Sequence, residues 1–73
     1  STAIYVFGDD YTGSSYDPVI ARITKMNRLQ PNGQRLAKIH GVGFLSKYTT
    51  GRFAILMREL TKRNGGTFLA LPL

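Results

Sequence analysis

Hydrophobic residues along the chain follow two spacings, one typical of strands and one typical of helices, and the spacings alternate. The first apolar run, from Ile4 to Phe7, is rich in β-branched and aromatic residues and ends at Gly8, which predicts a strand. Because the run has no polar position, we expect this strand to be buried on both faces. Two adjacent carboxylates, Asp9 and Asp10, follow directly.

A helix is predicted after a loop rich in turn-forming residues. Asp17 can act as its N-cap, with Pro18 at the first helical position, where the missing N–H costs nothing. Its apolar residues recur at helical spacing: Val19, Ile20, Ile23 and Met26. The helix ends before a tight turn at Asn32 and Gly33, because an Asn-Gly pair readily adopts positive φ.

A second strand is predicted from about Leu36 to Phe44. Its small residues, among them Gly41 and Gly43, indicate close approach by a helix or by neighbouring backbone. The next helix has Thr49 or Thr50 as its N-cap. A clean amphipathic stripe marks its buried side: Phe53, Leu56, Met57 and Leu60.

The second helix and the last strand are joined by a short glycine-containing turn. Glu59 can pair with Arg63 one helical turn later. Asn64-Gly65-Gly66 ends the helix, since a glycine there can adopt the left-handed conformation of a C-cap. The last strand is predicted from Thr67 to Leu71, before Pro72 ends its hydrogen bonding.

Strands that alternate with helices of this length predict parallel pairing, so the fold class is α/β with a βαβαβ order. The 73 residues are enough for a single small α/β domain covering residues 1–73. The sequence contains no cysteine, which excludes disulfides and thiolate metal sites. No apolar run approaches the ~20 residues that cross a bilayer, so we expect no membrane span.

The charge of the chain is positive and unevenly distributed. The formal net charge is +6, every basic residue lies from Arg22 onward, and Asp9, Asp10 and Asp17 are three of the four acids. A basic excess raises the question of nucleic acid. The basic residues are spread singly over the predicted elements, without the interleaved aromatics that stack bases. We therefore interpret them mainly as solvated helix faces.

Asp9 and Asp10 are the candidate chemical groups. In open α/β sheets the ligand crevice lies beyond the carboxyl ends of the strands, which makes them candidates for metal binding or catalysis. The structural alternative is that they satisfy backbone N–H groups in a turn or at a helix cap. The single histidine, His40, is expected to be a hydrogen-bonded structural residue. No catalytic triad or glycine-rich phosphate loop is evident, so the chain is not predicted to be an enzyme.

Several stretches carry a family resemblance through their order and spacing: Ile4–Asp10, Asn27-Arg28, Ala37–Phe44, Phe53–Leu60 and Asn64–Phe68. Together they resemble the C-terminal part of a bacterial von Willebrand factor type A (VWA) domain. The similarity spans nearly the whole chain. It implies that residues 1–73 are the C-terminal portion of such a domain, which is half of a Rossmann-like, doubly wound fold with helices on both faces.

The resemblance also implies a metal-ion-dependent adhesion site. Such a site takes ligands from three loops, and Asp9 matches the Asp of the last one, while Gly8 and Asp10 stand where the common pattern has Thr and Gly. The complete domain would hold Mg²⁺ or another divalent cation, with Asp9 and less directly Asp10 beside it, and a partner protein's carboxylate would complete the coordination. Because Mg²⁺ needs near-octahedral oxygen ligands, we expect no tight metal binding by this chain alone.

The strand order implied by the resemblance is 1-2-3, and right-handed crossovers would then place both helices on one face of the sheet. The other face would be apolar and bare, whereas parallel sheets are normally covered on both sides. The missing N-terminal half of the domain, a second copy of the chain, or a different strand order would solve this. The first strand would also form an edge open to strand addition. The leading hypothesis is a protein-interaction module, and the alternative is a basic nucleic-acid-binding module.

Overall fold

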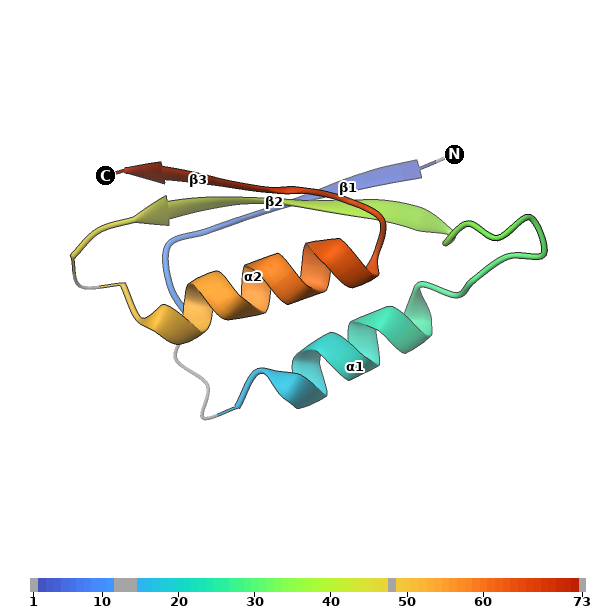
Figure 1. Cartoon of the computed structure of the whole chain (residues 1–73), viewed down its shortest axis with the longest axis horizontal. Helices are drawn as coiled ribbons and strands as arrows, with labels where there is room; N and C mark the ends of the chain where they lie inside the picture. Colours follow the sequence, from blue (N-terminus) through green and yellow to red (C-terminus); the bar gives the residue numbers. More distant parts are fainter. Residues whose placement is uncertain (1, 12–14, 48, 73) are drawn as a thin grey trace.

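The computed structural model describes residues 2–11, 15–47 and 49–72 of the chain. These residues form three strands and two helices in the order predicted from the sequence (Figure 1). The elements are β1 (Thr2–Gly8), α1 (Asp17–Met26), β2 (Ala37–Leu45), α2 (Gly51–Arg63) and β3 (Phe68–Pro72). Neither of the helices in the described part of the chain is long and apolar enough to cross a membrane.

The three strands form one parallel sheet in the order β1-β2-β3. Ile4 of β1 lies opposite Ile39 of the central strand, and Leu69 of β3 lies opposite Val42. Both helices lie on the same side of the sheet (Figure 1), as right-handed crossovers between successive neighbours require. The predicted parallel βαβαβ fold is confirmed, and β1 is an edge strand as expected.

The core lies between α2 and the sheet. The predicted stripe of α2 is confirmed, because all of its members are buried: Phe53, Leu56, Met57 and Leu60. Ile20 of α1 and Ile39 of β2 join two of these side chains in the main hydrophobic cluster. Gly41 lets β2 lie close to the helix, since an added Cβ would be only 2.7 Å from the Cε of Met57.

Helix α1 packs against α2 and is less buried than its sequence predicts. Ile20 is fully buried, whereas Met26 is 68% exposed. A hollow of about 310 Å³ remains between α1 and the strands, with Ile4 and Met26 in its lining. The predicted N-cap is wrong: Tyr16 occupies that position, and no side chain caps the helix. Asp17 is already helical, so its carboxylate lies in the first turn, where the helix dipole favours it.

The prediction that the first strand is buried on both faces is also wrong. Tyr5 and Phe7 are 60% and 64% exposed on the side away from the helices, and Ile4 on the helix side is 46% exposed. The physical reason is that both helices cover one face only, and α1 leaves the hollow beside Ile4. A continuous apolar run indicates that a strand is stabilised by burial on both faces. In this chain the helices bury only part of one face of β1.

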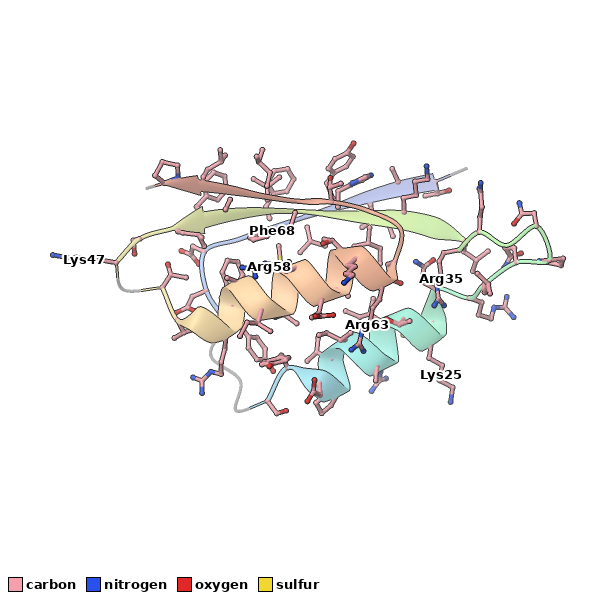
Figure 2. All side chains as sticks on the ribbon, viewed as in Figure 1. Lys25, Arg35, Lys47, Arg58, Arg63 and Phe68 are labelled. Carbon is pink, nitrogen blue, oxygen red and sulfur yellow. The ribbon has the colours of Figure 1, made fainter. Side chains whose placement is uncertain are left out.

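The face of the sheet that points away from the helices is apolar, and we call it the open face. Side chains alternate along a strand and paired residues share a face, which defines its members from the register. They are Ala3, Tyr5, Phe7, Lys38, His40, Val42, Phe44, Leu69 and Leu71, so the face is apolar except for Lys38 and His40. Figure 2 shows side chains projecting from the sheet on this side, away from both helices. The bare face expected from the 1-2-3 strand order is therefore present.

Candidate functional site

The candidate acidic residues lie at the edge where β1 and β2 end, which we call the carboxyl edge. Asp9 and Asp10 follow the last residue of β1, and both are exposed. A hollow of about 300 Å³ lies here, and four residues line it: Phe7, Gly8, Asp9 and Phe44. Since Phe7 and Phe44 belong to the open face, Asp9 stands at the rim of that apolar surface.

Asp10 joins the loop after β1 to the start of α2. Its Oδ1 accepts hydrogen bonds from the Thr50 hydroxyl at 2.7 Å, the Thr50 amide at 3.2 Å and the Tyr11 amide at 2.8 Å. Thr50 is the N-cap residue of α2, as predicted, but its own side chain does not cap the helix. The hydroxyl of Thr49 adds a further link by donating to the backbone carbonyl of Asp9 at 3.2 Å. Asp10 therefore has a structural role at the helix start.

These hydrogen bonds set the acidity of Asp10. The bond from the Thr50 hydroxyl, followed by the bond from the Tyr11 amide, lowers the pKa of Asp10 from its ordinary value of 3.8. Both donors stabilise the carboxylate relative to the protonated acid. Since the folded-state pKa is depressed, the charged form stabilises the fold above the unfolded value, and this stabilisation is lost as the pH falls through the folded-state pKa.

Replacing Asp10 with Ala should destabilise the chain most at neutral pH. The difference from the unsubstituted chain should begin to shrink below pH 3.8, where the unfolded chain takes up a proton, and should be lost as the pH falls through the lower folded-state pKa. Urea unfolding at a series of pH values measures this difference. The matched control is Asp9→Ala, which removes the same charge one position earlier and should have little effect. A destabilisation by Asp10→Ala that is constant from pH 7 to pH 2 would contradict the proposed linkage.

The carboxyl edge offers two adjacent carboxylates, Asp9 and Asp10, as candidate ligands for a divalent cation. Within the described ranges there is no group of three or more His, Cys, Asp or Glu residues placed to hold a metal. One oxygen of Asp10 is already engaged by three donors. Asp9 would thus contribute one side of a larger ligand set, and Mg²⁺ requires several further oxygens. The metal assignment of Asp9 and Asp10 remains a prediction about a complete domain.

His40 lies on the open face. It contacts Tyr5 of β1 and Thr67, the residue directly before β3. Its Nδ1 accepts a hydrogen bond from the Thr67 amide at 3.2 Å and lies 3.3 Å from the Thr67 hydroxyl oxygen. Its ring stacks on Tyr5 of β1, with centroids 5.0 Å apart and planes at 25°. These contacts agree with the predicted structural role of a hydrogen-bonded histidine.

Two buried asparagines were not predicted to matter, yet they join both helices to the central strand. The side chain of Asn27 donates to the Ala37 carbonyl at 2.7 Å and accepts from the Ala37 amide at 2.8 Å. It also donates to Oδ1 of Asn64 at 2.9 Å, and the Asn64 backbone carbonyl accepts from the Ile39 amide at 3.1 Å. Strand β3 pairs with β2 only from Gly41 onward. The two asparagines therefore bind the backbone groups of Ala37 and Ile39, which lie before the start of that pairing.

Asn64 is fully buried and completes the connection to both helices. Its Nδ2 donates to the Leu60 carbonyl of α2 at 2.8 Å and to the Thr24 hydroxyl of α1 at 3.1 Å. The sequence carried one signal for this network, which is that an Asn directly follows each helix. We interpreted Asn64 only as part of a helix-ending turn, and Asn27 only as part of the family resemblance.

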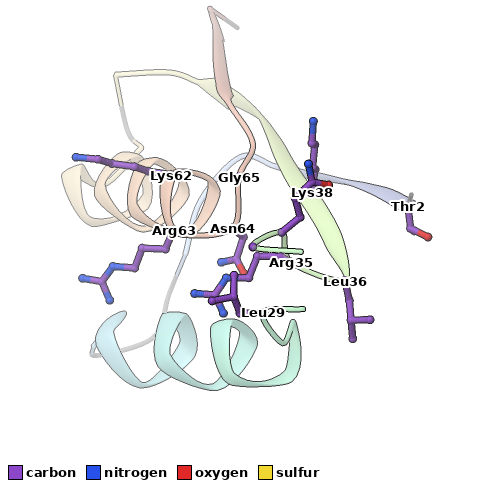
Figure 3. A pocket seen from close by; sticks show the side chains of 11 residues that line it. Thr2, Leu29, Arg35, Leu36, Lys38, Lys62, Arg63, Asn64 and Gly65 are labelled. Atoms are coloured by element: carbon purple, nitrogen blue, oxygen red, sulfur yellow. The ribbon is translucent and has the colours of Figure 1, made fainter. Parts of the chain in front are cut away.

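Basic side chains lie around a hollow at the end of the sheet opposite the carboxyl edge, whereas in the sequence they are spread singly over the predicted elements. A hollow of about 410 Å³ there has four cationic residues in its lining, and we call it the basic groove (Figure 3). They are Arg35, Lys38, Lys62 and Arg63. The residues come from the turn before β2, from β2 and from the last turn of α2, so only the fold brings them together.

The chain was compared with models of protein families, with curated proteins and with solved structures, and none of the three comparisons found a match.

Proposed function

We propose that the chain is a protein-interaction module, the C-terminal part of a VWA-type domain whose Asp9 loop forms one side of a metal-dependent binding site. The observation that carries this proposal is the position of Asp9 at the rim of the open face, beside Phe7 and Phe44. A carboxylate next to the exposed Phe7 and the half-buried Phe44 offers a partner both an apolar contact and a polar anchor. Exposed apolar patches of this kind commonly mark interaction sites.

The size of the open face favours a helical layer as its occupant. Three strands about 4.8 Å apart, each rising about 3.3 Å per residue, give a face of roughly 10–14 by 20 Å. Two helices, each about 10 Å across, would cover it. We therefore assign the open face to helices of the missing N-terminal half of the domain.

In the complete domain, Asp9 would be one ligand of Mg²⁺ or a similar cation, and the other ligands would come from loops outside these residues. Asp10 would support the site by fixing the start of α2 to the loop that carries Asp9. A Mg²⁺ titration of the isolated chain, monitored by the NMR signals of the Asp9 and Asp10 amides, tests this expectation. We expect no shift below millimolar Mg²⁺, and saturation at micromolar Mg²⁺ would contradict the coordination argument.

The VWA assignment is tested by the coding sequence that precedes Ser1. We expect a buried strand there, followed by Asp-x-Ser-x-Ser. An upstream sequence without this strand and motif would overturn the assignment. It would leave the open face and the Asp10 link unchanged, because these rest on the chain itself.

If the upstream sequence encodes this strand and motif, the upstream polypeptide, produced as a separate protein, should bind the chain through the open face. Phe7→Lys places a charge within the expected contact and should weaken binding at least tenfold, or about 1.4 kcal/mol. Ile55→Lys is the matched control, since Ile55 is an exposed apolar residue of α2, on the helix side. Titration calorimetry measures both. Equal weakening by the two variants would contradict docking on the open face.

A nucleic-acid-binding module is the second candidate, and the clustering of four cationic residues in the basic groove favours it. Phosphate contacts release counterions, so such binding would weaken steeply with salt. Retention of neither DNA nor RNA at low salt would exclude this function.

A further inference from the structure

The basic groove lies at the opposite end of the strands from Asp9, and its chemistry is independent of the interaction module proposed above. We propose that it binds a small ligand that carries a doubly charged phosphate or pyrophosphate group. The seven residues of β1 span about 20 Å, which separates the groove from the carboxyl edge.

The local charge of the groove is positive after the opposing charges are included. None of the described residues in its lining is acidic, although Glu59 pairs with Arg63 one helical turn away. The C-terminal ends of α1 and α2 each add about half a negative charge through the helix dipole. The four cations of the lining outweigh Glu59 and both helix ends, so the surroundings of the groove are positive. Lys62 points away from the groove, and Lys38 shares a face of the sheet with Ala3, so the two arginines are the groups closest to a ligand and the excess favours an anion.

Arg35 is a fixed donor in the groove. Its Nη1 donates to the carbonyls of Thr24 and Asn27, each at 3.2 Å, so the last turn of α1 holds the guanidinium in place. A guanidinium has five N–H donors, and these two bonds engage one nitrogen. The remaining donors are held in a fixed orientation suited to a phosphate, so a ligand would bind without ordering this side chain.

Arg63 is the second donor, and its present partner is weakly held. Its Nε lies 3.6 Å from Oε2 of Glu59, and both side chains are about half exposed. Exposed pairs of this kind contribute little, so an anion can compete with Glu59. In Figure 3 the side chains of Arg35 and Arg63 lie on the same side of Asn64, whereas Lys62 points away. The two arginines are therefore the central groups of the site.

The shape of the groove favours a small ligand over a nucleic-acid strand. Its volume of about 410 Å³ is within the usual range for small-molecule sites. The described lining residues include no aromatic side chain on which a base could stack. Leu29, which is exposed, lies beside Arg35 and offers an apolar surface for the carbon body of the ligand (Figure 3).

Inorganic pyrophosphate is the probe for this site. It is titrated into the chain at low salt, and binding is monitored by the NMR shifts of the backbone amides. We expect saturable shifts concentrated at Arg35, Lys38 and Gly65. Arg63→Gln should weaken binding about tenfold, which is the effect of losing one charge-assisted hydrogen bond. Absence of saturable binding at low salt, or shifts spread evenly over all basic residues, would overturn the proposal.

Arg58→Gln is the matched control, because it removes one positive charge from α2 at an exposed position outside the groove. It should weaken pyrophosphate binding less than twofold. Equal weakening by Arg58→Gln and Arg63→Gln would show attraction by net charge alone and would overturn the site. Lys38→Gln provides a second groove variant in case Arg63→Gln does not fold, and it should also weaken binding several-fold.

Glu59→Gln gives a test in the opposite direction. It frees Arg63 and removes a negative charge, so pyrophosphate should bind about threefold more tightly. Unchanged or weaker binding would contradict the proposed competition. A single-stranded oligonucleotide forms the last arm and should bind no more tightly than pyrophosphate. Tighter oligonucleotide binding that depends equally on Arg58 and Arg63 would replace the small-ligand site with the nucleic-acid function.

Discussion

Alanine in place of Gly66 should prevent the chain from folding. A Cβ at this position would collide with the backbone carbonyl oxygen of Ile39 and would lie 3.1 Å from the amide nitrogen of His40. Both neighbours belong to the central strand, so they cannot move without breaking the sheet. We expect a loss of about 4 kcal/mol or more. A chain of this length has a total stability of only about 4–11 kcal/mol.

Gly51→Ala is the matched control for this substitution. Gly51 begins α2, and an added Cβ would meet nothing within 4 Å. The control should be neutral or stabilising by up to about 1 kcal/mol, because alanine restricts the unfolded chain. Circular dichroism with urea unfolding compares the two variants. A folded Gly66→Ala chain that loses less than about 1 kcal/mol would show that the turn after α2 does not approach β2 as described.

The second large effect is expected from Asn27. Asn27→Ala leaves the amide and the carbonyl of Ala37 without their side-chain partner in a buried setting. Each unsatisfied group costs about 1–3 kcal/mol, so the total should be about 2–6 kcal/mol. Asn27→Asp keeps the shape but cannot donate at neutral pH, and it places a carboxylate against the oxygens of Ala37 and Asn64. It should therefore be at least as destabilising.

Asn32→Ala is the control for these asparagine variants. Asn32 lies in the exposed turn before β2, and its side chain accepts one hydrogen bond, from the Gln34 amide at 2.9 Å. Its loss should cost no more than about 1 kcal/mol. Urea unfolding gives the free energy of each variant. If Asn27→Ala and Asn32→Ala were equally mild, the buried asparagine network would not stabilise the chain.

Local patterns predicted most of the fold because each relies on neighbouring residues. The stripe of α2 is buried as expected, Gly33 has the positive φ of +84° that an Asn-Gly turn predicts, and Gly65 has a φ of +73° at the end of α2. Glu59 and Arg63 also pair as predicted. The burial of β1 was predicted wrongly, because burial depends on which elements cover a strand and not on the strand itself.

The features of the candidate site that the sequence did not reveal depend on residues far apart in the chain. Asp10 and Thr50 are 40 positions apart, and so are Thr24 and Asn64. The basic groove likewise joins Arg35 to Arg63, which no spacing rule relates. The sequence could place Asp9 and Asp10 after a strand, but only the strand order shows that Asp9 borders an open apolar face while Asp10 holds a helix.

The central claim is that the sheet has one covered and one open apolar face, and paramagnetic relaxation by a soluble nitroxide tests it most directly. We expect strong relaxation of the methyl groups of Leu69 and Leu71 in a dilute solution of the chain, and weak relaxation of those of Ile20 and Leu60. Equal protection of all four residues, unchanged on dilution, would contradict the claim, because it would mean that the chain covers both faces itself.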